Sequence, residues 1–288
     1  MSDAADVTAE ISAPSAQEAQ RTAGAATGGI ERIARAFTER RRMAALMPYL
    51  MGGYPSLERS REIGEAYVAA GADLLEIGVP YSDPLADGPV IHEAGARALA
   101  AGTDVGGVLE LVRALAPSVP VVLMCYANMV LAPGAEAFVE RLARTGACGL
   151  IVPDLPLEES TELREAADRA GIALVPLVAP TTPPERFALI ADAARGFLYT
   201  VSVLGTTGER AALPSRFAEV VSRAKASTEL PVALGFGIST AEHARQAADA
   251  GADGVIVGTR LVRAAGESED PASAVAEVLG AIASGLEQ

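Results

Sequence analysis

The chain has 288 residues, of which 50% are hydrophobic and only 4% aromatic, and its formal net charge is −14. Such a chain has neither a basic surface for phosphate backbones nor a set of aromatic platforms for bases, which argues against a nucleic-acid partner. No apolar run approaches the roughly 18 to 20 residues that span a bilayer, which argues against a membrane protein.

Residues 1–28 are rich in Ala, Ser, Thr and Gly and have no positive n-region or apolar h-region. This composition predicts a disordered tail rather than a secretory signal, so we expect a cytoplasmic protein. Cys125 and Cys148 each lie in an apolar stretch, which predicts buried free thiols in a reducing compartment.

The first predicted element is a capping helix in "GIERIARAFTERRRMAAL", with apolar residues at helical spacing (Ile30, Ile33, Ala34 and Phe37). Arg40, Arg41 and Arg42 follow its end, where cations suit the helix dipole. From Leu46 onward, eight short apolar runs alternate with amphipathic stretches: "LMPYLM", "DLLEIG", "PVVLMCY", "GLIVP", "ALVPLV", "FLYTV", "PVALGFG" and "GVIVG".

Runs that are apolar throughout fit parallel strands buried on both faces. A weak repeat places a glycine just before several of these strands, where it can end the preceding helix in a left-handed conformation (Gly71, Gly146, Gly171 and Gly251). Eight such units predict one α/β domain over residues 29–288, a (β/α)8 TIM barrel, with a doubly wound open sheet as the alternative.

Two carboxylates stand where a barrel has its active site, at the C-terminal end of a strand, in "LLEIGVPYSDPLADGP". Glu76 lies inside the second strand, where burial predicts a raised pKa suited to acid–base catalysis. Asp87 follows in a loop that three prolines stiffen. The alternative is that Glu76 pairs with an arginine and that Asp87, like Asp83, is a turn residue.

The loops after the last two strands, "GFGIST" and "GTR", carry glycines and lead into helices. In this fold they commonly form a phosphate site from backbone N–H groups and a hydroxyl, for which Gly237, Gly258 and Thr259 are the expected donors. The segment "SVLGTTGERAALP" after the sixth strand is either a lid or a surface loop. Tyr126 and Tyr199 end strands and face either the barrel mouth or the core.

The only lysine, Lys225, lies in an amphipathic helix rather than on a strand. Its position argues against imine chemistry and against pyridoxal phosphate bound covalently in this chain. With two histidines and two cysteines, the chain has too few nitrogen and sulfur ligands for a zinc site, and no metal is expected.

Together, "LLEIGVPYSDPLADGPVIHEA", "MCYAN", "VPDLPLEES", "GTTG", "GFGIS" and "GVIVGT" resemble the tryptophan synthase α subunit family, in the same order from Ile30 to Ala264. The resemblance implies a lyase of L-tryptophan biosynthesis, grouped with the carbon–oxygen lyases, that cleaves indole-3-glycerol phosphate to indole and glyceraldehyde 3-phosphate. Glu76 would then be the acid–base group, and Asp87 would bind the indole N–H. The expected substrate-binding residues are Tyr126, Tyr199, Thr207, Gly208, Phe236, Gly237, Gly258 and Thr259.

The resemblance also implies a pyridoxal-phosphate β subunit as partner, in an α–β–β–α heterotetramer, with no cofactor in this chain. Thr207 would contact Asp87 when the lid closes, although the lid is shortened and Val203 stands where some relatives carry arginine. Two other functions stay open: another phosphate-binding barrel enzyme of the same pathway, and a non-catalytic protein that only binds and activates the β subunit.

Overall fold

The structure, a computed structural model, describes residues 28–201, 217–235 and 237–287. Its sheet contains nine parallel strands in the order β5-β4-β3-β2-β1-β9-β8-β7-β6. The strands are β1 Ala45–Met51, β2 Leu75–Gly78, β3 Val121–Met124, β4 Gly149–Ile151, β5 Ala173–Leu174, β6 Leu177–Val178, β7 Leu198–Val201, β8 Val232–Gly235 and β9 Gly254–Val257. Each of the eight predicted runs contributes to this sheet.

The sheet closes into a barrel through residues 173–178, because β5 pairs with β4 while β6 pairs with β7. These two strands are one barrel strand that Pro176 divides. The Val175 N–H donates to the Leu150 carbonyl on one side, and the Pro176 carbonyl accepts from the Tyr199 N–H on the other. The (β/α)8 barrel prediction is therefore confirmed, with one run recorded as two strands because proline has no N–H for the ladder.

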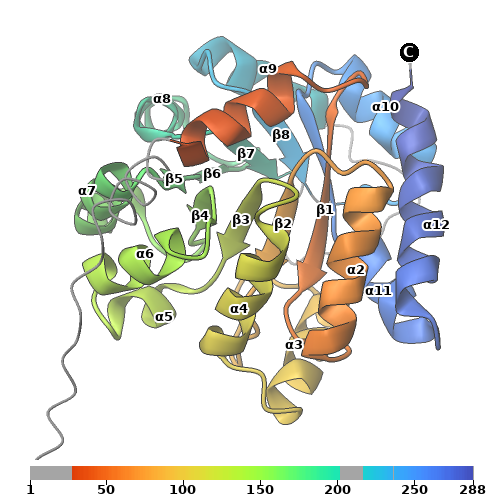
Figure 1. The fold of residues 1–288 in the computed structure, drawn as a ribbon. Coiled ribbons are helices and arrows are strands. Elements are labelled where there is room, and N and C mark those ends of the chain that lie inside the picture. Colours follow the sequence, from red (N-terminus) through yellow and green to blue (C-terminus); the bar gives the residue numbers. More distant parts are fainter. Residues whose placement is uncertain (1–27, 202–216, 236, 288) are drawn as a thin grey trace, which may run out of the picture.

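Helices surround the curled sheet (Figure 1). They are α2 Leu57–Ala69, α3 Pro89–Ala100, α4 Val105–Leu115, α5 Ala127–Leu131, α6 Ala135–Ala143, α7 Thr161–Ala170, α8 Pro184–Ala193, α9 Phe217–Ser227, α10 Ala241–Asp249, α11 Thr259–Glu267 and α12 Pro271–Ala283, with short 3-10 turns at Leu157–Glu159 and Ser284–Leu286. The four predicted helix-ending glycines, Gly71, Gly146, Gly171 and Gly251, all have positive φ, which confirms why glycine precedes these strands.

A helix over residues 28–38 lies across the N-terminal ends of the strands (Figure 1). Its Ile33 and Phe37 are fully buried and pack with Met47, Val122 and other residues of the barrel interior. Ala34, which helical spacing placed on the same face, is exposed. The predicted capping helix thus closes the bottom of the barrel with a narrower apolar stripe than expected.

Two aspartates clamp the strands at this same end. The Leu46 N–H donates to Asp73 Oδ2 at 2.8 Å, and the Val232 N–H donates to Asp253 Oδ2 at 2.8 Å. Each aspartate also donates its own backbone N–H to the strand that it clamps, at the Leu46 and Val232 carbonyls. The repeated "AGAD" motif therefore ties each of these strands to a neighbour by a side chain as well as by the ladder.

Asp253→Ala should lower the free energy of unfolding by about 1 to 3 kcal/mol, because it removes a buried backbone partner and the ion pair of Asp253 with Lys225 Nζ at 2.7 Å. Urea denaturation should show this loss while catalytic activity persists, since the clamp lies at the end of the barrel opposite the strand C-termini. Asp249→Ala, which breaks only an exposed pair with Arg245, is the control. Equal stability of the two variants would contradict a stabilising role for the Asp253 clamp.

Candidate active site

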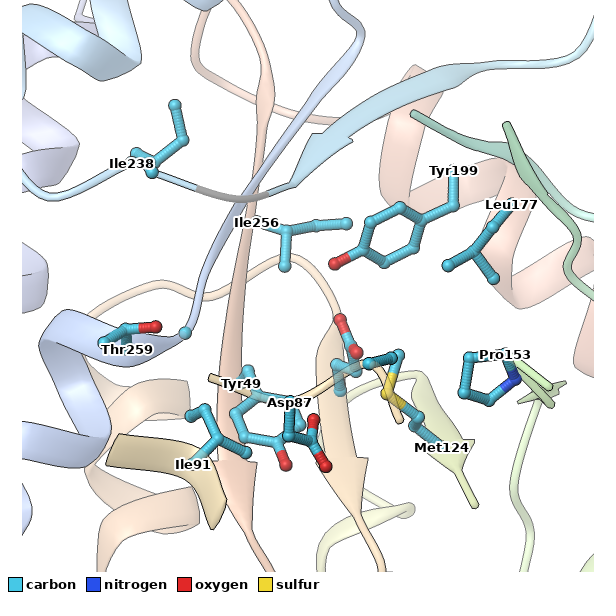
Figure 2. A pocket seen from close by; sticks show the side chains of 14 residues that line it. Tyr49, Asp87, Ile91, Met124, Pro153, Leu177, Tyr199, Ile238, Ile256 and Thr259 are labelled. Atoms are coloured by element: carbon cyan, nitrogen blue, oxygen red, sulfur yellow. The ribbon is translucent and has the colours of Figure 1, made fainter. Parts of the chain in front are cut away.

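A pocket of about 620 Å³, measured to its open mouth, lies at the C-terminal ends of the strands (Figure 2). Most of the barrel strands, or the loops that follow them, contribute to its wall. The lining residues are Tyr49, Glu76, Ala86, Asp87, Ile91, Met124, Pro153, Leu177, Tyr199, Gly237, Ile238, Ile256, Gly258 and Thr259. The pocket is mainly apolar, with two carboxylates and several hydroxyl and backbone groups placed around it.

Glu76 projects from β2 into this pocket and is 2% exposed. Its Oε2 is buried and has no hydrogen-bond partner among the described residues, and no arginine or lysine in this part of the chain forms an ion pair with it. Burial, and then the charge of Asp87, raise the pKa of Glu76 to about 8. The predicted raised pKa is confirmed, and the alternative of an arginine-paired strand residue is not what the structure records.

Asp87 is half-buried and is held by Tyr126, which follows β3. The Tyr126 hydroxyl donates to Asp87 Oδ2 at 3.1 Å and accepts from the Ala86 N–H at 3.1 Å. The Tyr81 ring stacks on Tyr126 with centroids 4.8 Å apart. These contacts fix the loop after β2, so that Asp87 faces the pocket as predicted.

The surroundings of Asp87 have opposing effects on the pKa of its carboxyl group. Burial raises the pKa of Asp87, while the hydrogen bond from Tyr126 and the charge of His92 lower it. Asp83, in the same loop, is exposed and accepts from the Ser82 hydroxyl at 2.5 Å. Asp83 is therefore the turn residue that the sequence predicted, and His92 is exposed to solvent.

Tyr49 and Tyr199 face the pocket from β1 and β7 (Figure 2). Tyr199, one of the expected substrate-binding residues, lies in the lining and is 4% exposed. The sequence does not predict a site role for Tyr49, because a tyrosine in the apolar run "LMPYLM" is typical of the hydrophobic core. The register that pairs Tyr49 with Glu76 would have identified it, since paired residues of adjacent strands face the same side.

The two glycine loops meet on one side of the pocket, where Gly237, Gly258 and Thr259 all line it. Gly237 has a φ of +85°, a conformation that favours glycine. The His243 ring donates from Nδ1 to the Gly237 carbonyl at 3.1 Å and steadies that loop. Helix α11 begins at Thr259 with Gly258 as its N-cap. The first N–H groups of a helix have no carbonyl of a preceding turn to pair with, so potential anion donors lie beside the pocket.

Thr207, Gly208, Val203 and Phe236 fall outside the described residues. Asp154 accepts from the Ala127 N–H at 2.8 Å, at the start of α5, and does not line the pocket.

Lys225 pairs with Asp253 at the opposite end of the barrel. Cys125 and Cys148 are buried and free, as predicted. Within the described ranges, no group of three or more His, Cys, Asp or Glu side chains is arranged to hold a metal ion, and no helix is long and apolar enough to cross a membrane.

Known proteins resemble this chain over most of its length. The family model described as tryptophan synthase alpha chain matches residues 36–288. The tryptophan synthase alpha chain of Synechococcus sp. (strain CC9902) is 53% identical over 221 residues, covering 76% of this chain and 82% of that protein. The one from Gloeobacter violaceus is 50% identical over 236 residues, covering 81% and 86%.

Solved structures agree with the sequence comparison. A chain of Mycobacterium tuberculosis tryptophan synthase superposes with a TM-score of 0.84 at 39% identity, covering 89% of this chain and 98% of that one. A chain of the tryptophan synthase α2β2 complex from Pyrococcus furiosus superposes with a TM-score of 0.79 at 35% identity, covering 84% and 98%. The similarity thus extends over the whole barrel and includes the strands that carry the pocket.

Proposed function

The chain belongs to the tryptophan synthase alpha chain family, and from that premise we propose that Glu76 and Asp87 perform the chemistry of its reaction. That reaction is the cleavage of indole-3-glycerol phosphate to indole and glyceraldehyde 3-phosphate, a lyase step in tryptophan biosynthesis. The observation that supports the assignment most strongly is the buried Glu76 carboxyl, whose Oε2 has no partner among the described residues and which lies beside Asp87 in the pocket.

Glu76 acts first as an acid. With its pKa near 8 it holds a proton at neutral pH, which it gives to the indole ring carbon that bears the side chain. The resulting carboxylate takes the proton from the hydroxyl on the neighbouring side-chain carbon as the carbon–carbon bond breaks. The bond electrons return to the ring, the aldehyde leaves, and Glu76 ends protonated. No imine is needed, which agrees with the absence of a lysine from the lining.

Asp87 serves the same reaction electrostatically. Protonating the ring carbon places positive charge on the indole nitrogen, and a carboxylate that accepts the indole N–H stabilises that charge. Tyr126 holds Asp87 for this role, and Tyr199 lies beside the substrate ring. The residues expected to bind the phosphate are Gly208, Gly237, Gly258 and Thr259, of which Gly208 falls outside the described residues.

A β subunit is the expected partner and carries the pyridoxal phosphate, in an α–β–β–α assembly. The Pyrococcus furiosus relative is described as part of an α2β2 complex. In this chain we expect the contact at residues 80–84 and 128–134, after β2 and β3. Leu131 (53% exposed) lies in the second range at the end of α5, and Leu85 (78% exposed) adjoins the first, so both offer apolar side chains suited to a protein contact.

Mixing this chain with its β subunit should therefore shift its elution in size-exclusion chromatography to the mass of a heterotetramer. The double variant Leu85→Asp, Leu131→Asp should weaken the shift, because it places charge in an apolar contact. Leu189→Asp, at a leucine on α8 whose 61% exposure lies between those of Leu85 and Leu131, is the control. No shift with the unaltered chain would count against the assembly.

The function itself is tested by incubating the purified chain, alone and with the β subunit, with indole-3-glycerol phosphate and measuring released indole. Release that depends on Glu76 supports the enzyme. No release under either condition, with glycerol 3-phosphate still bound, would favour the binding-only alternative.

A further inference from the structure

Tyr49 stands next to Glu76 on the neighbouring strand. The Cα of Tyr49 pairs with that of Glu76 in the β1–β2 ladder, so both side chains point into the barrel. Tyr49 is 6% exposed and lines the pocket (Figure 2). Its side chain is therefore part of the reaction chamber.

The position of the Tyr49 hydroxyl is set by two glycines. At one end of the side chain, the Tyr49 Cβ lies close to Gly258, where an added Cβ would meet it at 3.7 Å. At the other end, a Cβ on Gly78 would overlap the hydroxyl itself. Gly78 is two residues beyond Glu76 on β2 and faces the same side. The ring thus extends from the phosphate loop to the space directly above Glu76, at the start of the loop that carries Asp87.

This hydroxyl has hydrogen-bonding capacity left to use. Its recorded contact within the described residues is with Met51 Sδ at 4.0 Å, and a thioether is a weak acceptor. Tyr126, in contrast, both donates and accepts through its hydroxyl. A buried hydroxyl whose recorded hydrogen-bond partner among the described residues is a thioether is available to a stronger acceptor that comes within reach.

Asp87 is the acceptor that the surroundings favour. After burial, the charge of Asp87 is the largest cause that raises the pKa of Tyr49, ahead of Glu76, Tyr126 and Tyr199, so the hydroxyl stays a donor. Tyr126 donates to Asp87 Oδ2, and among the described residues the structure records no hydrogen bond to Oδ1. β1 and β3 flank β2 on either side, so Tyr49 and Tyr126 approach the loop after β2 from its two neighbours.

We propose that Tyr49 is a positioning residue: with substrate in the pocket, its hydroxyl donates a hydrogen bond to the Asp87 carboxylate, which is then held by two tyrosines from the strands flanking β2. This inference rests on the function proposed above for Asp87. The two donors keep the carboxylate ionised and aimed at the indole N–H. Tyr49 itself transfers no proton.

The test compares Tyr49→Phe with Tyr67→Phe in the full chain with its β subunit. Tyr67 is a matched control, because it is also buried and its hydroxyl donates to the Tyr49 carbonyl at 3.3 Å, away from the pocket. Tyr49→Phe should lower kcat/KM for indole release about tenfold to a hundredfold, the usual effect of one hydrogen bond to a charged group. Glycerol 3-phosphate should bind as before.

A second readout separates positioning from packing. Removing a donor raises the pKa of the Asp87 carboxyl, so the acidic limb of the kcat/KM profile should move up by about half a pH unit in Tyr49→Phe. The groups that face Tyr49 and Asp87, namely Glu76, Tyr126, Tyr199 and His92, are unchanged in both variants. Tyr67→Phe and Met51→Leu should leave the limb in place.

The outcomes are distinct. An unmoved acidic limb in Tyr49→Phe, or the same rate loss in Tyr67→Phe or Met51→Leu, overturns the positioning role while leaving the function intact. If Asp87→Asn retains full activity, or the unaltered chain releases no indole, the proposed function fails and this inference fails with it.

Discussion

Glu76→Gln should reduce the rate of indole release by about a thousandfold or more, within the range that general acid–base groups supply. Glutamine keeps the shape and hydrogen-bonding ability of the side chain but cannot give a proton to the ring carbon or take one from the hydroxyl. Glycerol 3-phosphate, whose proposed site near Gly237 and Gly258 does not include Glu76, should bind to the variant and to the wild type with the same affinity. Steady-state kinetics and calorimetry measure the two effects.

The same substitution should stabilise the protein at alkaline pH. Burial raises the pKa of Glu76 from 4.5 to about 8, so between these values the folded state keeps a proton that the unfolded chain has lost. The free energy of unfolding of the wild type therefore falls as pH rises through this window, by about 1.4 kcal/mol per pH unit at most. The glutamine side chain of the variant has no carboxyl proton to lose, so the variant gains stability relative to the wild type from about pH 5 to pH 8.

The loss of indole release and the pH-dependent gain in stability would together identify the Glu76 carboxyl as the buried proton donor. Chemical denaturation at pH 5 should give similar stabilities, and at pH 8 Glu76→Gln should be the more stable protein. Glu62→Gln, at a partly exposed position on α2, is the control for the loss of one carboxylate. Full activity in Glu76→Gln, or a stability difference that does not change with pH, would discard Glu76 as the buried proton donor.

Asp87→Asn should lower kcat by about a hundredfold to a thousandfold, the cost of removing one group that stabilises charge in the transition state. Asparagine can keep the hydrogen bond from Tyr126 and can still accept the indole N–H, so the geometry of the loop persists. The negative charge is lost, and with it the stabilisation of the protonated indole. KM should change far less than kcat, because the substrate is uncharged at this nitrogen before proton transfer.

Asp83→Asn is the matched control, since Asp83 is in the same loop but is exposed and, in the part of the chain that the structure describes, accepts only from the Ser82 hydroxyl. It should retain wild-type kinetics. A rise in KM with unchanged kcat in Asp87→Asn would mean that Asp87 only binds the substrate, and the electrostatic role would have to be given up.

Much of the fold and the two central carboxylates were predictable from sequence. The apolar runs predicted the strands because a parallel sheet covered on both faces has no polar side. The helix-ending glycines supported the prediction by marking where each helix stops before the next strand. Glu76 stood out because an ionisable residue inside such a run is uncommon. The loops around Gly237 and Gly258 were predictable because barrels reuse that place for phosphate.

The features that were missed depend on contacts between residues far apart in the chain. Tyr49 looked like an ordinary core residue until the register placed it beside Glu76. The link from Tyr126 to Asp87 joins residues 39 positions apart, and each aspartate clamp spans more than 20. The sequence displays the participants in such contacts, but only the curvature of the closed sheet determines which of them meet.

The contacts that hold the barrel closed lie far from the pocket. Asp73, Asp253 and the plug formed by Ile33 and Phe37 secure the barrel at the ends where its strands begin, whereas the pocket occupies the ends where they finish. Substitutions in the pocket wall that alter substrate preference therefore disturb few of the contacts that keep the barrel closed. Random libraries confined to the pocket wall should yield a high proportion of folded variants, which makes the chain a tolerant scaffold for selecting altered substrate preference.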